Sequence, residues 1–140
     1  MEGILEELYD KRKRLHKKLS AIGDFRRGII SVNYRKCGKQ NCSCAKEGHP
    51  GHGPQYLWNT TIKGKSYAKS IPLGAELWKY TQETDNYRKF TELCSEIIDV
   101  NEKICNLREV PTVDDNEAAS LKKKLLKRFK TKYKEKLARL

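Results

Sequence analysis

The chain has 140 residues and a formal net charge of +12, with 37% hydrophobic and 34% charged side chains. This length allows one small domain with additional segments, and so polar a composition leaves only part of the chain for a packed core. No apolar run approaches the about 18 residues that a membrane span needs, and the acidic, amphipathic first residues do not read as a signal peptide. We therefore expect a cytoplasmic protein with no membrane partner.

Residues 2 to 22 have the pattern of an amphipathic helix. Leu8, Leu15 and Ile22 recur every seven residues and form one apolar stripe, and a glycine follows as a natural stop signal. Six lysines and arginines between residues 11 and 18 make the middle of this helix basic. These charges fit a solvated face as well as a surface that binds an anion.

The predicted strands cover residues 25 to 35, 55 to 62 and 65 to 71. In the first, Ile30, Val32 and Tyr34 alternate with polar side chains. The turn signal Lys63-Gly64 joins the second and third strands as a hairpin. We expect an α+β fold: a small three-stranded antiparallel sheet with a metal-binding loop, flanked by the N-terminal helix and a long heptad-patterned helix, plus a basic C-terminal helix.

The loop between the first two predicted strands contains three cysteines and two histidines within sixteen residues. Thiolate and imidazole groups are the ligands that Zn²⁺ prefers, and a closed structural site needs four of them in a tetrahedron. Cys37, Cys42 and Cys44 with one histidine would complete such a set. On the residues alone, either His49 or His52 could be the fourth ligand.

Three alternatives compete with a metal site in this loop. Free cysteines that pack as small hydrophobes rarely crowd into a polar loop rich in Gly and Pro. Disulfides are rare in the reducing compartment to which we assign the chain. An iron–sulfur cluster usually takes four thiolates, and the other two cysteines, Cys94 and Cys105, lie far along the chain in a helical pattern, where we expect them in the core. We therefore favour zinc.

The same loop also carries a family resemblance. Its marks are Cys37-Gly-Lys-x-x-Cys42-x-Cys44, then His52-Gly-Pro54, then an aromatic strand with Tyr56 and Trp58. By these marks, residues 25 to 107 resemble a small prokaryotic zinc-binding-like domain family of unknown function. The resemblance implies a metal-bearing fold with His52 as the fourth ligand, because His49 lies outside the signature. It implies no reaction.

From residue 75 to residue 107 the helical pattern is continuous. One apolar seam has the 3-4 spacing of heptads and consists of Phe90, Leu93, Ile97, Val100, Ile104 and Leu107. A second stripe beside it consists of Tyr80, Tyr87, Cys94, Ile98 and Cys105. The N-terminal helix would cover one stripe as an antiparallel coiled pair, and the sheet or a second copy of the chain would cover the other. A homodimer through this helix is therefore one expected partner arrangement.

Residues 1 to 108 are predicted to form the domain, residues 109 to 116 a linker with a proline and turn formers, and residues 117 to 140 a basic helix or tail. Residues 121 to 140 contain ten Lys or Arg and one acid, a net charge of +9, whereas the other 120 residues have 20 basic and 17 acidic side chains, a net charge of +3. So basic a block usually binds a polyanion, most often a nucleic acid.

These observations favour a zinc-stabilised, non-catalytic nucleic-acid-binding protein, with duplex DNA preferred over RNA. The tail would attract phosphates through counterion release, and the polar sheet face would contact bases through Asn33, Arg35, Asn59 and Thr61. The expected contact residues are Arg26, Arg27, Asn33, Arg35, Lys36, Lys39, Lys46, Lys122, Lys123, Lys124, Lys127, Arg128, Lys130, Lys132 and Lys134. The rings of Tyr56, Trp58 and Tyr67 could stack the bases of a single strand, but we favour their packing between the sheet and the long helix.

The alternative function is a dimeric coiled-coil structural or adaptor protein that mediates protein–protein interaction. Catalysis has little support, because the chain has no Gly-rich phosphate loop and no G-x-S-x-G or H-E-x-x-H motif. Its acids are scattered rather than clustered as in two-metal nucleases. A metal with three protein ligands and a water could be catalytic. Glu47 is the only acid in the loop, however, and one acid is weak evidence for a general base. We expect no enzyme and no small-molecule substrate.

Overall fold

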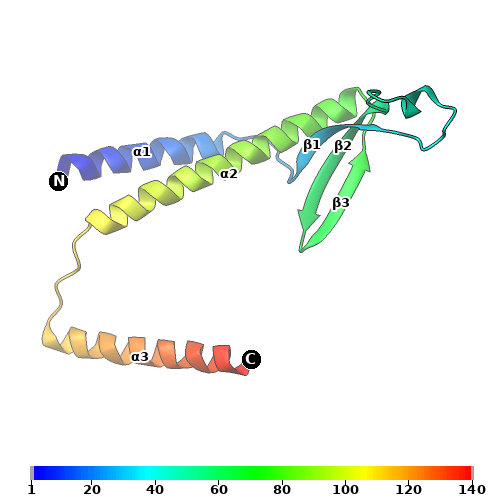
Figure 1. Cartoon of the computed structure of the whole chain (residues 1–140). Coiled ribbons are helices and arrows are strands. Elements are labelled where there is room, and N and C mark those ends of the chain that lie inside the picture. Colours follow the sequence, from blue (N-terminus) through cyan, green and yellow to red (C-terminus); the bar gives the residue numbers. More distant parts are fainter. Residues whose placement is uncertain (1, 140) are drawn as a thin grey trace. The chain divides into compact units, whose positions relative to one another are not determined.

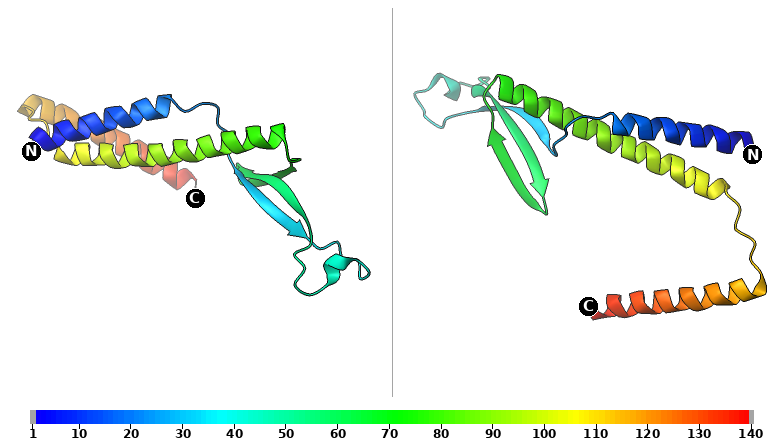
Figure 2. Two further views of the ribbon diagram at one scale, coloured as in Figure 1. Left: turned by 90° about the horizontal axis from the view of Figure 1, so that it is seen from above. Right: turned by 180° about the vertical axis from the view of Figure 1, so that it is seen from behind.

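The computed structural model describes residues 2 to 139 (Figures 1 and 2). Its elements in chain order are α1 (Glu2–Ser20), β1 (Ile29–Arg35), the 3-10 turn η1 (Ser43–Ala45), β2 (His52–Ile62), β3 (Lys65–Ser70), α2 (Ala75–Leu107) and α3 (Asp115–Ala138). Three helices and one antiparallel sheet make an α+β fold, which confirms the predicted fold class. The chain divides into two compact units, one that ends at Leu107 and one from Arg108 onward. Within the described residues, no helix combines the length and the apolar character that crossing a membrane would require.

α1 lies antiparallel against the C-terminal half of α2, which the views of Figures 1 and 2 show alike. The buried core of this pair consists of Leu15, Ile97, Val100 and Ile104. Partly buried side chains surround it, namely Leu5, Leu8, Tyr9, Leu19 and Leu93. Arg12 Nη1 donates a hydrogen bond of 3.0 Å to Asn101 Oδ1 across the pair. The apolar stripe predicted for the N-terminal helix and the 3-4 seam of the long helix therefore cover each other.

The sheet has the strand order β1-β2-β3, and both strand pairs are antiparallel. β1 pairs with β2 from Ile29 opposite Asn59 to Arg35 opposite His52. A tight turn at residues 63 and 64 joins β2 to β3, as predicted. The cysteine-rich loop therefore leaves and re-enters the sheet at one end, and the hairpin turn lies at the other.

β1 begins at Ile29, four residues later than predicted, because the preceding residues make no backbone ladder with β2 and bond instead to α2 and to the Trp58 side chain. The backbone N–H of Arg26 donates to the backbone carbonyl of Glu83 at 3.1 Å. The ring of Phe25 stacks on that of Phe90, with 4.6 Å between their centroids. Residues 25 to 28 thus form a connection along the helix rather than the start of a strand.

One face of the sheet packs against the N-terminal half of α2. This second buried cluster consists of Ile71, Leu77 and Tyr80, with Ile30, Tyr56 and Trp58 packed against it. The rings of Trp58 and Tyr80 meet edge to face at 5.5 Å. The predicted core packing is confirmed for Tyr56 and Trp58 but wrong for Tyr67, whose side chain is 45% exposed. Tyr67 lies on β3, the outer strand, where every residue is exposed.

The second apolar stripe of α2 is covered along only part of its length. Tyr80 is buried and Tyr87 and Cys94 are half-buried, whereas Ile98 and Cys105 are exposed. The expectation that Cys105 packs in the core is therefore wrong. The sheet covers the stripe near its N-terminal end, and α1 follows the other seam.

The unit from Arg108 onward contains α3. Asp114 caps this helix, since its Oδ1 accepts a hydrogen bond of 2.8 Å from the backbone N–H of Glu117. The helix therefore begins at Asp115, two residues earlier than predicted. None of its described residues is buried, and all of them except the half-buried Ala118 are exposed.

Candidate metal centre

The candidate metal centre lies in the connection between β1 and β2. The pairing of Arg35 with His52 brings the two ends of this connection together. Cys42 and Cys44 lie at η1, where the backbone N–H of Ala45 donates to the carbonyl of Cys42 at 3.0 Å. The strand pairing and the short turn together return the middle of the loop to its ends.

Four ligand atoms converge in this loop. The Sγ atoms of Cys37, Cys42 and Cys44 and a ring nitrogen of His52 all lie within 4.8 Å of one another. Cys37 Sγ lies 3.4 Å from Cys44 Sγ, and Cys42 Sγ lies 3.2 Å from His52 Nε2. A disulfide would need about 2.05 Å between sulfurs, and all three cysteines are free thiols. The arrangement is consistent with a metal site.

The cluster has a closed inner side and an open rim. Cys44 is fully buried, whereas Cys37 and His52 are exposed and Cys42 is half-buried. An ion at this place would therefore be bound near the surface by ligands from both strand ends and from η1. Such a site ties three points of the chain together, which suits structural stabilisation.

Gly51 sets the approach of β2 to β1 beside the cluster. It is buried and has a φ of +106°, and a Cβ atom at this position would lie 2.6 Å from the carbonyl carbon of Arg35 and 2.8 Å from its oxygen. An L side chain is thus excluded by its conformation and by the contact with backbone. A larger residue would force β2 outward and carry His52 away from the sulfurs.

The electrostatics of the cluster favour thiolates at its rim. A backbone hydrogen bond from Lys39, with further hydrogen bonds from His52 and Cys44, lowers the pKa of Cys37 to about 6. A backbone hydrogen bond from Cys44 lowers the pKa of Cys42. Cys37 is therefore largely ionised at neutral pH, which is the form that binds a metal.

The remaining two groups hold their protons more strongly. A backbone hydrogen bond from Cys37 acts to lower the pKa of Cys44, but burial and the neighbouring sulfurs of Cys37 and Cys42 outweigh it and raise that pKa. Hydrogen bonds to Cys37 and Cys42 raise the pKa of His52. Negative charge on the neighbouring sulfurs contributes to both pKa shifts, and a bound cation would neutralise that charge.

His49 lies outside the cluster. Its Nδ1 accepts a hydrogen bond of 3.0 Å from the backbone N–H of Gly51, and its side chain is half-buried. This contact fixes the turn before β2. The structure therefore brings His52, and not His49, to the three sulfurs.

The residues predicted to contact nucleic acid fall into both units. In the connection before β1, on β1 and in the metal loop, the exposed ones are Arg27, Asn33, Arg35, Lys36, Lys39 and Lys46. On α3, all are exposed: Lys122, Lys123, Lys124, Lys127, Arg128, Lys130, Lys132 and Lys134. From Phe25 to Lys46 the sequence contains no acidic residue, so the charged side chains of this stretch are all basic.

Arg26 differs from the other predicted contacts because its guanidinium is already engaged. Its Nε lies 3.2 Å from Glu83 Oε1, and its guanidinium carbon lies 3.9 Å from the ring centroid of Tyr80 and 5.1 Å from that of Trp58. A hydrogen bond from Lys79 and the charge of Arg26 lower the pKa of Glu83 despite its partial burial. Glu83 was not predicted as a partner, and no local pattern indicates it, since 57 positions separate the pair.

Fold and site define a small α+β domain in which a cluster of three cysteines and one histidine closes the connection between two antiparallel strands. The model of the family described as "Domain of unknown function (DUF6788)" matches residues 5 to 77, more than half of the chain, and the chain belongs to this family. The match spans α1, the sheet with its cluster and the start of α2, so it begins and ends earlier than the range 25 to 107 of the resemblance. Comparisons with the curated proteins and with the solved structures found no match.

Proposed function

We propose that the chain is a zinc-stabilised nucleic-acid-binding protein without catalytic activity. The zinc part follows from the donor set, because three thiolates and one imidazole are typical ligands of structural zinc. Tetrahedral zinc with Zn–S bonds of about 2.3 Å separates two sulfurs by about 3.8 Å, near the 3.4 Å between Cys37 and Cys44. Four protein ligands would fill the tetrahedron and leave no open position for a substrate.

α3 is the observation that carries the nucleic-acid part. Every residue from Leu121 to Arg139 is exposed, and this stretch contains ten Lys or Arg and one acid. None of the four ion pairs among residues 2 to 139 involves it. So many unpaired cations on one helix repel each other, and a polyanion would relieve that repulsion.

The cations of α3 include a regular basic face. Lys123, Lys127, Lys130 and Lys134 follow one another at steps of four, three and four residues, which places them along one side of a helix. They extend over about 16 Å at about 1.5 Å per residue. Duplex DNA carries one phosphate charge for about each 1.7 Å of its axis, so each lysine has a phosphate within reach. The exposed cations of the metal loop would add contacts from the other unit.

The test is the salt dependence of binding by the full chain to a random-sequence DNA duplex, followed by fluorescence anisotropy. Exchange of Lys123, Lys127, Lys130 and Lys134 for glutamine should reduce the slope of log affinity against log salt by about 3.6, because each neutralised phosphate contributes about 0.9. The matched control exchanges four lysines of α1, namely Lys11, Lys13, Lys17 and Lys18, and makes the same change in net charge.

Two outcomes would contradict the proposal. A full chain without salt-sensitive binding to DNA or RNA at low ionic strength would remove the nucleic-acid part and leave the zinc part standing. An unchanged slope in the α3 variant, together with a reduced slope in the α1 control, would place the binding surface on the first helix instead.

The uncovered stripe of α2 favours a second candidate function, a dimeric adaptor. Ile98 is 56% exposed beside the seam that α1 covers. A second copy of the chain could bury this side chain together with Cys94 and Cys105. A monomeric chain in solution would exclude this candidate, whereas a dimer is compatible with both, so salt-dependent binding of random-sequence DNA separates the two.

A further inference from the structure

The sheet contains a notch at the end opposite the metal centre. β1 begins at Ile29 opposite Asn59, whereas β2 and β3 stay paired as far as Ile62 and Lys65. Beyond Asn59, the edge of β2 that faces β1 therefore has no strand beside it. A cavity of about 510 Å³ occupies this place. Its volume falls within the about 300 to 1,000 Å³ of small-molecule sites.

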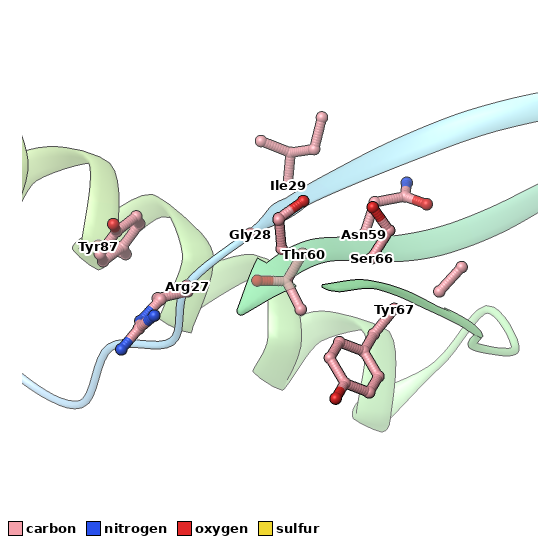
Figure 3. Close-up of a pocket in the computed structure, with 10 residues that line it drawn as sticks. Arg27, Gly28, Ile29, Asn59, Thr60, Ser66, Tyr67 and Tyr87 are labelled. Carbon is pink, nitrogen blue, oxygen red and sulfur yellow. The ribbon is translucent and has the colours of Figure 1, made fainter. Parts of the chain in front are cut away.

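The three strands, α2 and the connection before β1 supply the walls of this notch. Figure 3 shows Arg27 and Tyr87 on one side, Tyr67 on the opposite side and Thr60 between them. Tyr87 belongs to α2 and stacks with Phe25 at 6.2 Å between ring centroids. This contact restricts the movement of the Tyr87 ring. The ring of Tyr67 comes from β3 and has an exposed face.

The backbone beside the notch is fixed by close packing. Trp58 Nε1 donates a hydrogen bond of 2.8 Å to the carbonyl of Arg27. Gly28 has a φ of +115°, and a Cβ atom there would lie 2.4 Å from the carbonyl oxygen of Asn59 and 2.6 Å from Trp58 Nε1. No side chain fits at Gly28. Close packing at this glycine fixes the position of the backbone turn, and Arg27 lies beside it at the rim of the notch.

The lining of the notch combines the aromatic rings of Tyr67 and Tyr87 with the cation of Arg27, and it contains no carboxylate. The Arg27 guanidinium has no ion-pair partner among residues 2 to 139. The Asn59 carboxamide, whose Nδ2 donates to Ser31 Oγ at 2.7 Å, lies on the opposite face of the sheet from Tyr67, because Tyr67 pairs with Thr60 and successive side chains alternate between the faces. Lys65 Nζ lies 5.7 Å from the ring centroid of Tyr67 and adds a second positive charge.

We infer that the notch binds an unpaired nucleotide of a nucleic-acid strand, which rests on the proposed function and specifies its substrate. A base would stack on Tyr67, and the phosphate would meet Arg27. A free mononucleotide offers the same chemistry. The strand is the better occupant because the cavity is open to solvent and the cations at its rim, Arg27 and Lys65, come from both of its sides.

The inference is tested with the full chain and a labelled oligothymidylate, with a DNA duplex measured in parallel. Tyr67→Ala should weaken binding of the single strand roughly 5- to 150-fold, the range expected for loss of one stacked base, and should leave duplex affinity within about twofold of the wild type. Tyr67→Phe keeps the ring and should retain single-strand affinity. Trp78→Ala is the matched control, since Trp78 is 67% exposed on α2 and lies outside the notch.

The outcomes separate this inference from the proposed function. Salt-sensitive binding of DNA that is unaffected by Tyr67→Ala would overturn the notch and leave the proposed function intact. Absence of any nucleic-acid binding would overturn both. Direct, Tyr67-dependent binding of thymidine monophosphate, without binding of the oligonucleotide, would assign the notch to a free nucleotide and overturn the strand. A thermal unfolding midpoint of Tyr67→Ala equal to that of the wild type shows that an affinity loss is not a loss of folding.

Discussion

Exchange of Cys42 for serine in the zinc-loaded protein should destabilise the sheet by at least about 3 kcal/mol. The ion would cross-link a loop of sixteen residues from Cys37 to His52, and a cross-link across about fifteen residues stabilises a fold by about 3 kcal/mol through the entropy of the unfolded chain. The free energy of metal coordination adds to this amount, so the entropic value is a lower limit.

Urea unfolding followed by Trp58 fluorescence measures this loss. Trp58 lies where the sheet meets α2, and a Trp78→Phe background removes the exposed second tryptophan. With a slope of about 1.5 kcal/mol per M urea, a loss of about 3 kcal/mol lowers the midpoint by about 2 M. Cys105→Ser is the matched control because Cys105 is exposed, and it should leave the midpoint unchanged. Equal midpoints for the Cys42 and Cys105 variants would show that no metal cross-link stabilises the sheet.

Three further predictions concern the ligand set, its protons and the helix surface. His52→Ala should lower the zinc content found by elemental analysis after dialysis, whereas His49→Ala should not, and the reverse ranking would identify His49 as the ligand. Zinc content should fall steeply as the pH drops below about 6. Cys37, whose pKa is lowered to about 6, then regains its proton, and zinc would have to displace that proton in order to bind. Full retention of zinc at pH 4 would contradict this prediction. If the chain dimerises through α2, Ile98→Lys should lower the mass found by sedimentation at high micromolar concentration, and a monomeric wild type would refute the dimer.

Ile98 rather than Ile97 is the suitable probe of that interface for a structural reason. Ile97 is buried in the seam between α1 and α2, so a lysine there would disrupt the helix pair within one chain. The 3-4 spacing in the sequence marks both positions as apolar. It does not reveal which of the two stripes the N-terminal helix covers.

Periodicity predicted the long helix completely, since the pattern from residue 75 to residue 107 matches the bounds of α2. Helix and strand periods are local properties, and a helix of 33 residues contains many turns in which the period can be detected. The four ligand atoms of the cluster were likewise predicted within one short loop. Their proximity follows from the pairing of two strands whose alternating pattern is visible in the sequence.

Contacts between distant parts of the chain could not be predicted in this way. The alternation in residues 25 to 35 does not show that Arg26 bonds to Glu83 and so delays the start of β1. Tyr67 has the same aromatic character as Trp58, yet it is exposed because α2 does not cover the outer strand. Both differences depend on where one helix crosses the sheet, which residue types alone do not determine.

The two buried clusters of the larger unit lie at separate places along α2. Thr84 is the last buried residue of its N-terminal half and Ile97 is the first of its C-terminal half, and no residue between them is buried. Apolar burial gives a helix most of its resistance to local opening. Backbone amides near the middle of α2 should therefore exchange with solvent faster than those at either cluster. Each half would open as an independent cooperative unit, and a loosened metal end would leave the pairing with α1 undisturbed.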